Sequence, residues 1–125
     1  MKYLCIVYTE EATLAAMPDQ EFEQLDADSL AYDKEIRDAG HFLAAQALQS
    51  VQTATTLRVR KNKLSATDGP FAETKEQLCG FVLIQAKDLN EALRVASKIP
   101  SARVGSIEVR PVRELAERQP WDRRG

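Results

Sequence analysis

Two short segments carry apolar side chains on both of their faces, and this pattern limits how the chain can fold. Residues 2–9 read KYLCIVYT, and residues 80–86 read GFVLIQA. Both are rich in residues that favour strands, and successive side chains of a strand point to opposite faces. A sheet that contains both strands therefore presents apolar side chains on each face, and each face needs a cover.

A first helix that could cover this sheet is predicted over residues 19–39. Its candidate buried side chains recur three and four residues apart along one face: Phe22, Leu25, Ser29, Tyr32 and Ile36. Asp19 and Glu21 suit the positive end of the helix dipole, and Gly40 is a natural C-terminal stop.

A second helix is predicted to begin at Asp88 and to end before Pro100. Glu91 follows Asp88 by three residues, which is the spacing of a capping box with Asp in the usual Ser/Thr place. The predicted buried stripe of this helix consists of Leu89, Ala92, Leu93, Ala96 and Ile99.

Further strands are predicted over residues 41–48, 54–60, 64–67 and 106–112. In the stretch 54–60, Leu57 and Val59 alternate with polar residues, so one face of this strand should meet water. The sequence Lys-Asn-Lys at 61–63 predicts a turn, which makes 54–67 a hairpin.

The resulting order is strand, helix, strand, inserted hairpin, strand, helix, strand. We therefore expect an α+β fold, the ferredoxin-like split βαβ with an inserted hairpin, over residues 1–112. A charged C-terminal tail follows at 113–125 and holds the only tryptophan, Trp121. Because two helices cover one face of such a sheet, we expect a second copy to cover the other, sheet against sheet, as a homodimer.

The charge balance argues against a direct nucleic-acid partner. The chain has 17 Lys and Arg residues against 19 Asp and Glu residues. Its densest basic stretch, residues 58–63, is short and has no aromatic side chains for base stacking, so a solvated turn explains it better than a phosphate contact.

The N-terminal apolar run is shorter than a signal-peptide core or a membrane span, so we expect a cytoplasmic protein without a membrane contact. Cys5 and Cys79 lie far apart and predict small buried side chains in a reducing compartment. One histidine and scattered carboxylates predict no metal site, and neither nucleotide-binding motif, GxGxxG or P-loop, is present, so no cofactor is expected.

Residues 67–81 read TDGPFAETKEQLCGF and form the most distinctive motif of the chain. Asp68 before Gly69 and Pro70 favours a tight turn, because its carboxylate can accept backbone N–H bonds and proline fixes the chain direction. A short helical turn could follow at 73–77. From spacing alone, a structural turn is the simplest interpretation.

The same motif resembles the signature of the DGPF proteins, a branch of the YCII-related family. The similarity includes the opening MKY, ATTLRVR at 54–60, Ala92, IP at 99–100 and IEVRPV at 107–112. Cys79 stands where a glycine is common.

This resemblance implies a dimeric α/β barrel with a shared cleft at the dimer interface. Members of the wider family resemble small enzymes with a His–Asp pair in that cleft, whereas the DGPF branch has no settled activity. Its members are often encoded near extracytoplasmic-function sigma factors, so a sigma-factor partner is implied by genomic context alone.

Asp68 and His41 are the candidate catalytic residues. Asp68 could act as a general base or accept a hydrogen bond from a ligand, or it could cap its own turn. His41, the sole histidine, could serve as general acid or base beside a carboxylate, or it could be a hydrogen-bonded surface residue. The sequence leaves open whether the two lie at the same end of the sheet.

The candidate ligand contacts are Gly69, Pro70, Phe71, Glu73, Lys75 and Tyr8. Phe71 could form a wall over a ligand or pack in the core. Glu73 and Lys75 could contact a substrate, or they could pair locally at helical spacing.

Three functions fit these residues. The favoured one is a non-catalytic domain that binds a small polar ligand in a cleft at a homodimer interface, because a single histidine and one signature carboxylate make a thin catalytic set. The alternatives are a small acid–base enzyme that uses Asp68 and His41, and an interaction partner of a sigma factor.

Overall fold

The computed structural model describes residues 1–116, so Trp121 and most of the predicted tail lie outside the described residues. The elements follow in the order β1 (Lys2–Thr9), α1 (Glu11–Ala16), α2 (Asp19–Asp38), β2 (Phe42–Ala47), η1 (Val51–Thr53), β3 (Thr55–Arg60), β4 (Lys63–Asp68), β5 (Gln77–Gln85), α3 (Leu89–Ala96), η2 (Pro100–Arg103) and β6 (Ser106–Pro111). None of the helices in this part of the chain has the length and apolar character needed to span a membrane.

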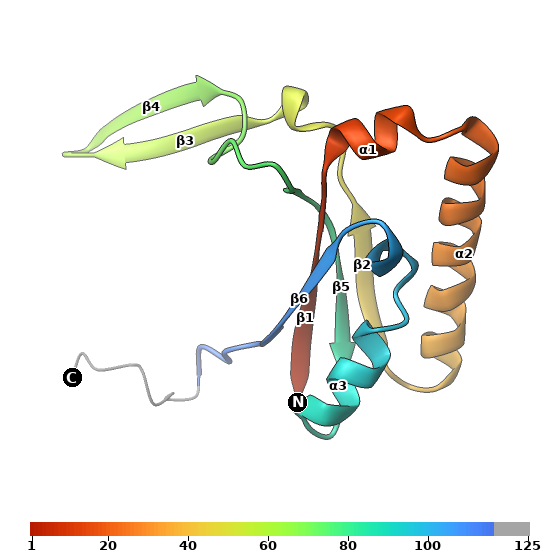
Figure 1. Cartoon of the computed structure of the whole chain (residues 1–125). Coiled ribbons are helices and arrows are strands. Elements are labelled where there is room, and N and C mark those ends of the chain that lie inside the picture. Colours follow the sequence, from red (N-terminus) through yellow and green to blue (C-terminus); the bar gives the residue numbers. More distant parts are fainter. Residues whose placement is uncertain (117–125) are drawn as a thin grey trace.

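One antiparallel sheet has the strand order β2-β5-β1-β6. The central strand β1 pairs with β5 on one side and with β6 on the other, and β2 pairs with the outer edge of β5. Helices α2 and α3 lie on the same face of this sheet (Figure 1). The predicted α+β class is therefore confirmed, and the strand order is compatible with the ferredoxin-like split βαβ.

The core lies between the sheet and these two helices. Its most deeply buried members are Tyr3, Cys5, Ile36, Ile84, Ala92 and Ala96. Cys5 is fully buried as predicted, whereas Cys79 is only partly buried, and both thiols are free.

Local sequence signals define the C-terminal end of α2 and the start of α3. At the end of α2, Gly40 adopts φ +86°. The amide of His41 donates to the carbonyl of Ile36, and the amide of Gly40 donates to the carbonyl of Arg37, so the helix ends in a Schellman motif. At the start of α3, the Asp88 carboxylate accepts from the amide of Glu91 at 2.9 Å, so the predicted cap is confirmed.

Three local expectations were wrong. In α3, Val95 is buried, whereas Leu89 and Leu93 of the predicted stripe are 47% and 45% exposed, because the short helix turns a narrow stripe of small side chains toward the sheet. Residues 73–77 form no helical turn, and β5 already begins at Gln77. The short helix α1 was not expected between the first strand and α2.

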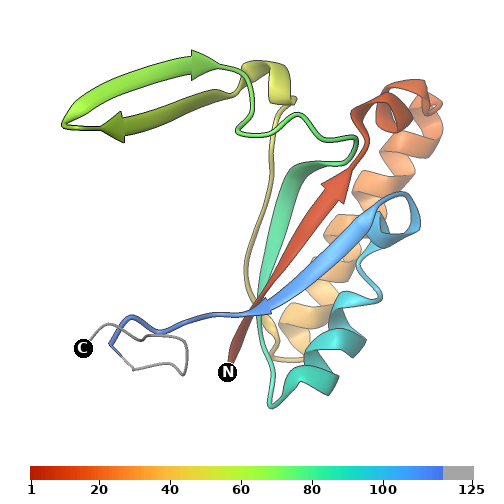
Figure 2. The same cartoon turned by 60° about the vertical axis from the view of Figure 1, so that its left-hand side comes forward.

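No helix within the described part of the chain lies over the opposite face of the sheet (Figure 2). Leu4 pairs with Leu83 and Ile6 with Phe81 across the central strands, and all four alternate with side chains of the core. Their apolar side chains therefore lie on the face turned away from α2 and α3 (Figure 2). We call these four residues the uncovered face.

Strands β3 and β4 form a separate two-stranded sheet that projects from one end of the molecule on the same side as the uncovered face (Figure 2). We call this hairpin the arm. Leu57 and Val59 are 62% and 61% exposed on it. One face of β3 was expected to meet water, and the apolar side chains of the strand are exposed as well, because no other layer of the described chain packs on the arm.

Candidate functional site

The signature turn is held together by backbone groups and by Thr56. Gly69 adopts φ +111°, its amide donates to the carbonyl of Ala54 at 2.8 Å, and the Thr56 hydroxyl donates to its carbonyl at 2.9 Å. The Asp68 side chain is exposed, and no residue among 1–116 donates a hydrogen bond to its carboxylate. Asp68 therefore does not cap its own turn, and its carboxylate faces water.

A groove of about 510 Å³ lies beside this turn. Residues from the signature, from α1 and from η1 line it, and they include Gly69, Pro70, Glu73, Lys75, Glu11 and Gln52. Asp68 is next in sequence to the lining residues without being one of them. Four of the predicted ligand contacts thus meet in one groove.

Helix α1 shapes the other wall of the groove through Glu11. Its carboxylate accepts from the amide of Val51 at 2.7 Å and from the hydroxyl of Ser50 at 3.0 Å. These two bonds join α1 to η1, which are far apart in sequence. No signal in the sequence indicated this contact, because it depends on a helix that the pattern did not predict.

The groove carries charges of both signs. Lys75 Nζ lies 3.9 Å from a carboxylate oxygen of Glu10, and both residues line the groove. Gln77 stiffens the loop by donating from Nε2 to the carbonyls of Ala72 and Thr74, each at 3.0 Å. A lining of this kind suits a small polar molecule that has both donors and acceptors.

Phe71 neither packs in the core nor lines the groove. Its side chain is 79% exposed, and the guanidinium carbon of Arg58 lies 5.6 Å from the centre of its ring. The interpretation of Phe71 as a core residue was therefore wrong for a single chain.

Tyr8 lies away from the groove, near the end of β1. It pairs with Leu78 and Ser106, and its hydroxyl donates to the Glu108 carboxylate at 3.2 Å. Desolvation and, next, this hydrogen bond raise the pKa of the Tyr8 phenol above its ordinary value. Tyr8 belongs to the side of the sheet that carries the uncovered face.

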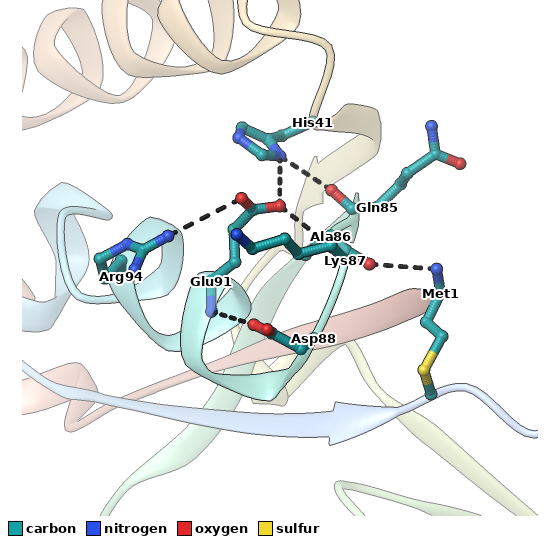
Figure 3. A network of polar contacts seen from close by, with 8 residues as sticks. All are labelled: Met1, His41, Gln85, Ala86, Lys87, Asp88, Glu91 and Arg94. Carbon is teal, nitrogen blue, oxygen red and sulfur yellow. Dashed lines mark hydrogen bonds and ion pairs between the residues drawn. The ribbon is translucent and has the colours of Figure 1, made fainter.

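His41 takes part in a polar network at the start of α3 (Figure 3). Its Nδ1 lies 2.9 Å from the carbonyl oxygen of Gln85 and 4.0 Å from a carboxylate oxygen of Glu91. A carbonyl oxygen can only accept, so the contact with Gln85 requires the proton on Nδ1. The Glu91 carboxylate also accepts from the amide of Lys87 at 3.0 Å.

His41 and Asp68 lie at opposite ends of the molecule. His41 contacts Gln85, the last residue of β5. Asp68 ends β4, and the loop that follows it leads to Gln77, the first residue of β5. The nine residues of β5 separate these ends by roughly 27 Å at about 3.4 Å per residue. The two candidate catalytic residues therefore do not form an acid–base pair within a single chain, a question that the sequence had left open.

Comparison with known proteins bears on the family of this chain. The model of the YCII-related domain matches residues 1–116. The chain belongs to the YCII-related family. This YCII-related protein is 38% identical over 114 residues to an uncharacterized protein of Rhizobium meliloti (strain 1021), a match that covers 90% of this chain and 92% of that protein. The finer assignment to the DGPF branch stays a prediction.

No group of three or more His, Cys, Asp or Glu side chains within residues 1–116 is arranged to hold a metal ion. The side chains that line the groove offer hydrogen bonds and charges through one lysine, several carboxylates and side-chain amides.

Proposed function

We propose that this YCII-related protein binds a small polar ligand in the groove beside the signature turn, and that two copies pair through the uncovered face. The observation that carries the proposal is the groove itself. It gathers Gly69, Pro70, Glu73 and Lys75 of the signature opposite Glu11, although the sequence offered no reason for α1 to lie there.

The groove suits binding because its polar groups are held in place. Glu11 is fixed by its two bonds to η1, and Gln77 is fixed by its two bonds to the loop. Groups that are already positioned lose little conformational entropy when a ligand arrives. The Lys75 side chain is 82% exposed and is the lysine of the groove lining, so it is the group that could pair with an anionic part of a ligand.

The uncovered face supports the pairing of two copies. Leu4, Phe81 and Leu83 are partly exposed in a single chain, whereas Ile6 is only 5% exposed. Apolar surface left in water costs about 25 cal/mol per Å². The arm and the signature loop project on the same side, so a second copy seated on this face would lie close to the groove (Figure 2).

Binding ranks ahead of acid–base catalysis because of where His41 lies. An acid–base pair needs its members within hydrogen-bond reach of one reacting group. Asp68 has no such partner among residues 1–116, and His41 is engaged with Gln85 at the far end of the sheet.

The proposal is tested by thermal-shift measurements with a panel of amino acids, small dicarboxylic acids and sugar phosphates. We expect at least one compound to stabilise the parent, and Lys75→Gln and Asp68→Asn to reduce its effect. Lys63→Gln is the matched control, because it removes the same charge from the arm tip, outside the groove. Equal stabilisation of the parent, Lys75→Gln and Asp68→Asn by every active compound would contradict the proposal.

A further inference from the structure

A second cavity lies between α2 and the helix-covered face of the sheet, and it has a volume of about 540 Å³. It shares no lining residue with the groove of the signature turn, so a ligand could occupy this cavity whether or not the groove binds one. Cavities of roughly 300–1,000 Å³ with a mostly apolar lining are typical of small-molecule sites.

The cavity exists because small residues of α2 and of the sheet face one another where the helix packs on the strands. Ser29 of α2 lies opposite Ala45 and Ala47 of β2 and Gly80 of β5. Nearer the C-terminal end of α2, the larger side chain of Phe42 packs against the core instead.

Most of its lining is apolar, and one of its polar groups is a buried hydroxyl. Thr9 is 1% exposed, and its Oγ1 lies 3.3 Å from Cys79 Sγ. A threonine hydroxyl can donate one hydrogen bond and accept two, and a thiol is a weak partner. Thr9 therefore keeps hydrogen-bonding capacity toward the cavity that it lines.

Among residues 1–116, the charged side chains that line the cavity are both carboxylates, Asp26 and Asp33, and no Lys, Arg or His lines it. The two aspartates are seven residues apart on α2, so they lie on one face of the helix, about 10 Å from each other along its axis. No described residue lies within hydrogen-bond or ion-pair distance of the Asp33 carboxylate. Burial raises the pKa of Asp33, although the nearby charge of Arg37 opposes this shift.

We propose that this cavity binds a small amphiphilic amine, whose apolar body lies between α2 and the sheet and whose ammonium group lies beside Asp33. The apolar lining favours a hydrocarbon body. The two carboxylates favour a cation over an anion, because a bound anion would meet like charge with no compensating cation in the lining.

The test uses three probes of equal chain length: n-octylammonium, n-octanol and n-octanoate. Isothermal titration on the full chain at neutral pH and low salt should give saturable binding that is tightest for octylammonium and weakest for octanoate, by about tenfold or more between these two. Octanoate binding as tightly as octylammonium, octanol binding more tightly than octylammonium, or no saturable binding of any probe would overturn the proposal.

Variants separate the apolar and the charged parts of the site. Ser29→Leu fills the cavity and improves helix propensity, so it should weaken the binding of octylammonium and octanol at least tenfold without unfolding the protein. Ser29→Ala is its control and should bind as the parent does. The double change Asp26→Asn with Asp33→Asn should weaken octylammonium about 3- to 10-fold and leave octanol unchanged. Glu23→Gln, on the same helix but outside the lining, should change nothing.

Cys79 reports where the probe binds. Its partly buried thiol lines the cavity, whereas Cys5 is fully buried in the core. Saturating octylammonium should therefore slow the reaction of Cys79 with iodoacetamide in the parent and leave it unchanged in Ser29→Leu. Equal slowing in both proteins would place the probe elsewhere and overturn the proposal.

Discussion

At the scale of single residues, Cys5 links burial to the pH dependence of stability. Its thiol is fully buried at the centre of β1, and burial raises its pKa from 9.0 to about 11. Below pH 9 the thiol is protonated in both the folded and the unfolded chain, so it adds no pH dependence. Between pH 9 and 11 the unfolded chain loses this proton and the folded chain does not, so stability falls as pH rises, by up to about 3 kcal/mol in all.

Urea unfolding at a series of pH values from 7 to 10.5 measures this effect. Cys5→Ala should be less stable than the parent at pH 7, because it leaves a small cavity, but its stability should fall less steeply above pH 9. Burial raises the pKa of Tyr32 from 10.0 to about 12, so this phenol contributes a similar loss above pH 10 in both proteins. Parallel stability curves for the parent and Cys5→Ala would show that the thiol is not the group that titrates.

The sequence predicted which residues belong to the candidate site, but it did not predict how far apart these residues lie from one another. The motif at 67–81 pointed to Gly69, Pro70 and Lys75, and all three line the groove. The pairing of Asp68 with His41 was undecidable, because one sequence does not say at which end of a sheet two strand ends lie. Thr56, which holds the signature turn, was expected only as a polar position on a strand.

At the scale of elements, the arm depends on its turn. Lys61 and Asn62 both have positive φ, 51° and 63°, as the central residues of a type I′ hairpin turn do. Alanine avoids positive φ, so Asn62→Ala should destabilise the arm by about 1–2 kcal/mol. Hydrogen exchange of the β3 and β4 amides measures the change, and the amides of β1 and β5 should keep their protection.

Asn62→Gly is the matched control, because glycine adopts positive φ without strain and should protect the arm amides at least as well as asparagine does. Equal exchange in the Ala and Gly variants would mean that the turn does not limit the arm. An isolated two-stranded hairpin is marginally stable, so the arm should also exchange faster than the main sheet.

Elements with local signals were predictable, and those that depend on tertiary contacts were not. The C-terminal end of α2 and the cap of α3 follow from Gly40 and from the spacing of Asp88 and Glu91, which act within one turn. Helix α1 was not predicted, because it has no buried residue and no side-chain cap and therefore leaves no hydrophobic or capping pattern in the sequence. In α3, the choice between Val95 and Leu93 for burial depends on how the helix lies on the sheet.

At the scale of the whole molecule, helices α2 and α3 occupy one face of the sheet, and no helix of residues 1–116 covers the apolar side chains of the other face. The sequence already indicated that two helices would leave one apolar face uncovered, because residues 2–9 and 80–86 carry apolar side chains on both faces of their strands. The arm is consistent with the same need for a cover, because it exposes Leu57 and Val59 on the side of the uncovered face. Two copies packed sheet against sheet would satisfy both.

Leu83→Glu tests this pairing directly. The side chain is partly exposed in a single chain, so a carboxylate there can stay hydrated and the monomer should fold, whereas between two sheets it would be buried without a partner. Sedimentation should therefore show a dimer for the parent at micromolar concentration and a dissociation constant at least about 100-fold higher for the variant. Leu89→Glu makes the same change on α3, away from the uncovered face, and should leave the dimer intact. A parent that sediments as a monomer, or a Leu83→Glu variant that pairs as tightly as the parent, would rule out the uncovered face as the interface.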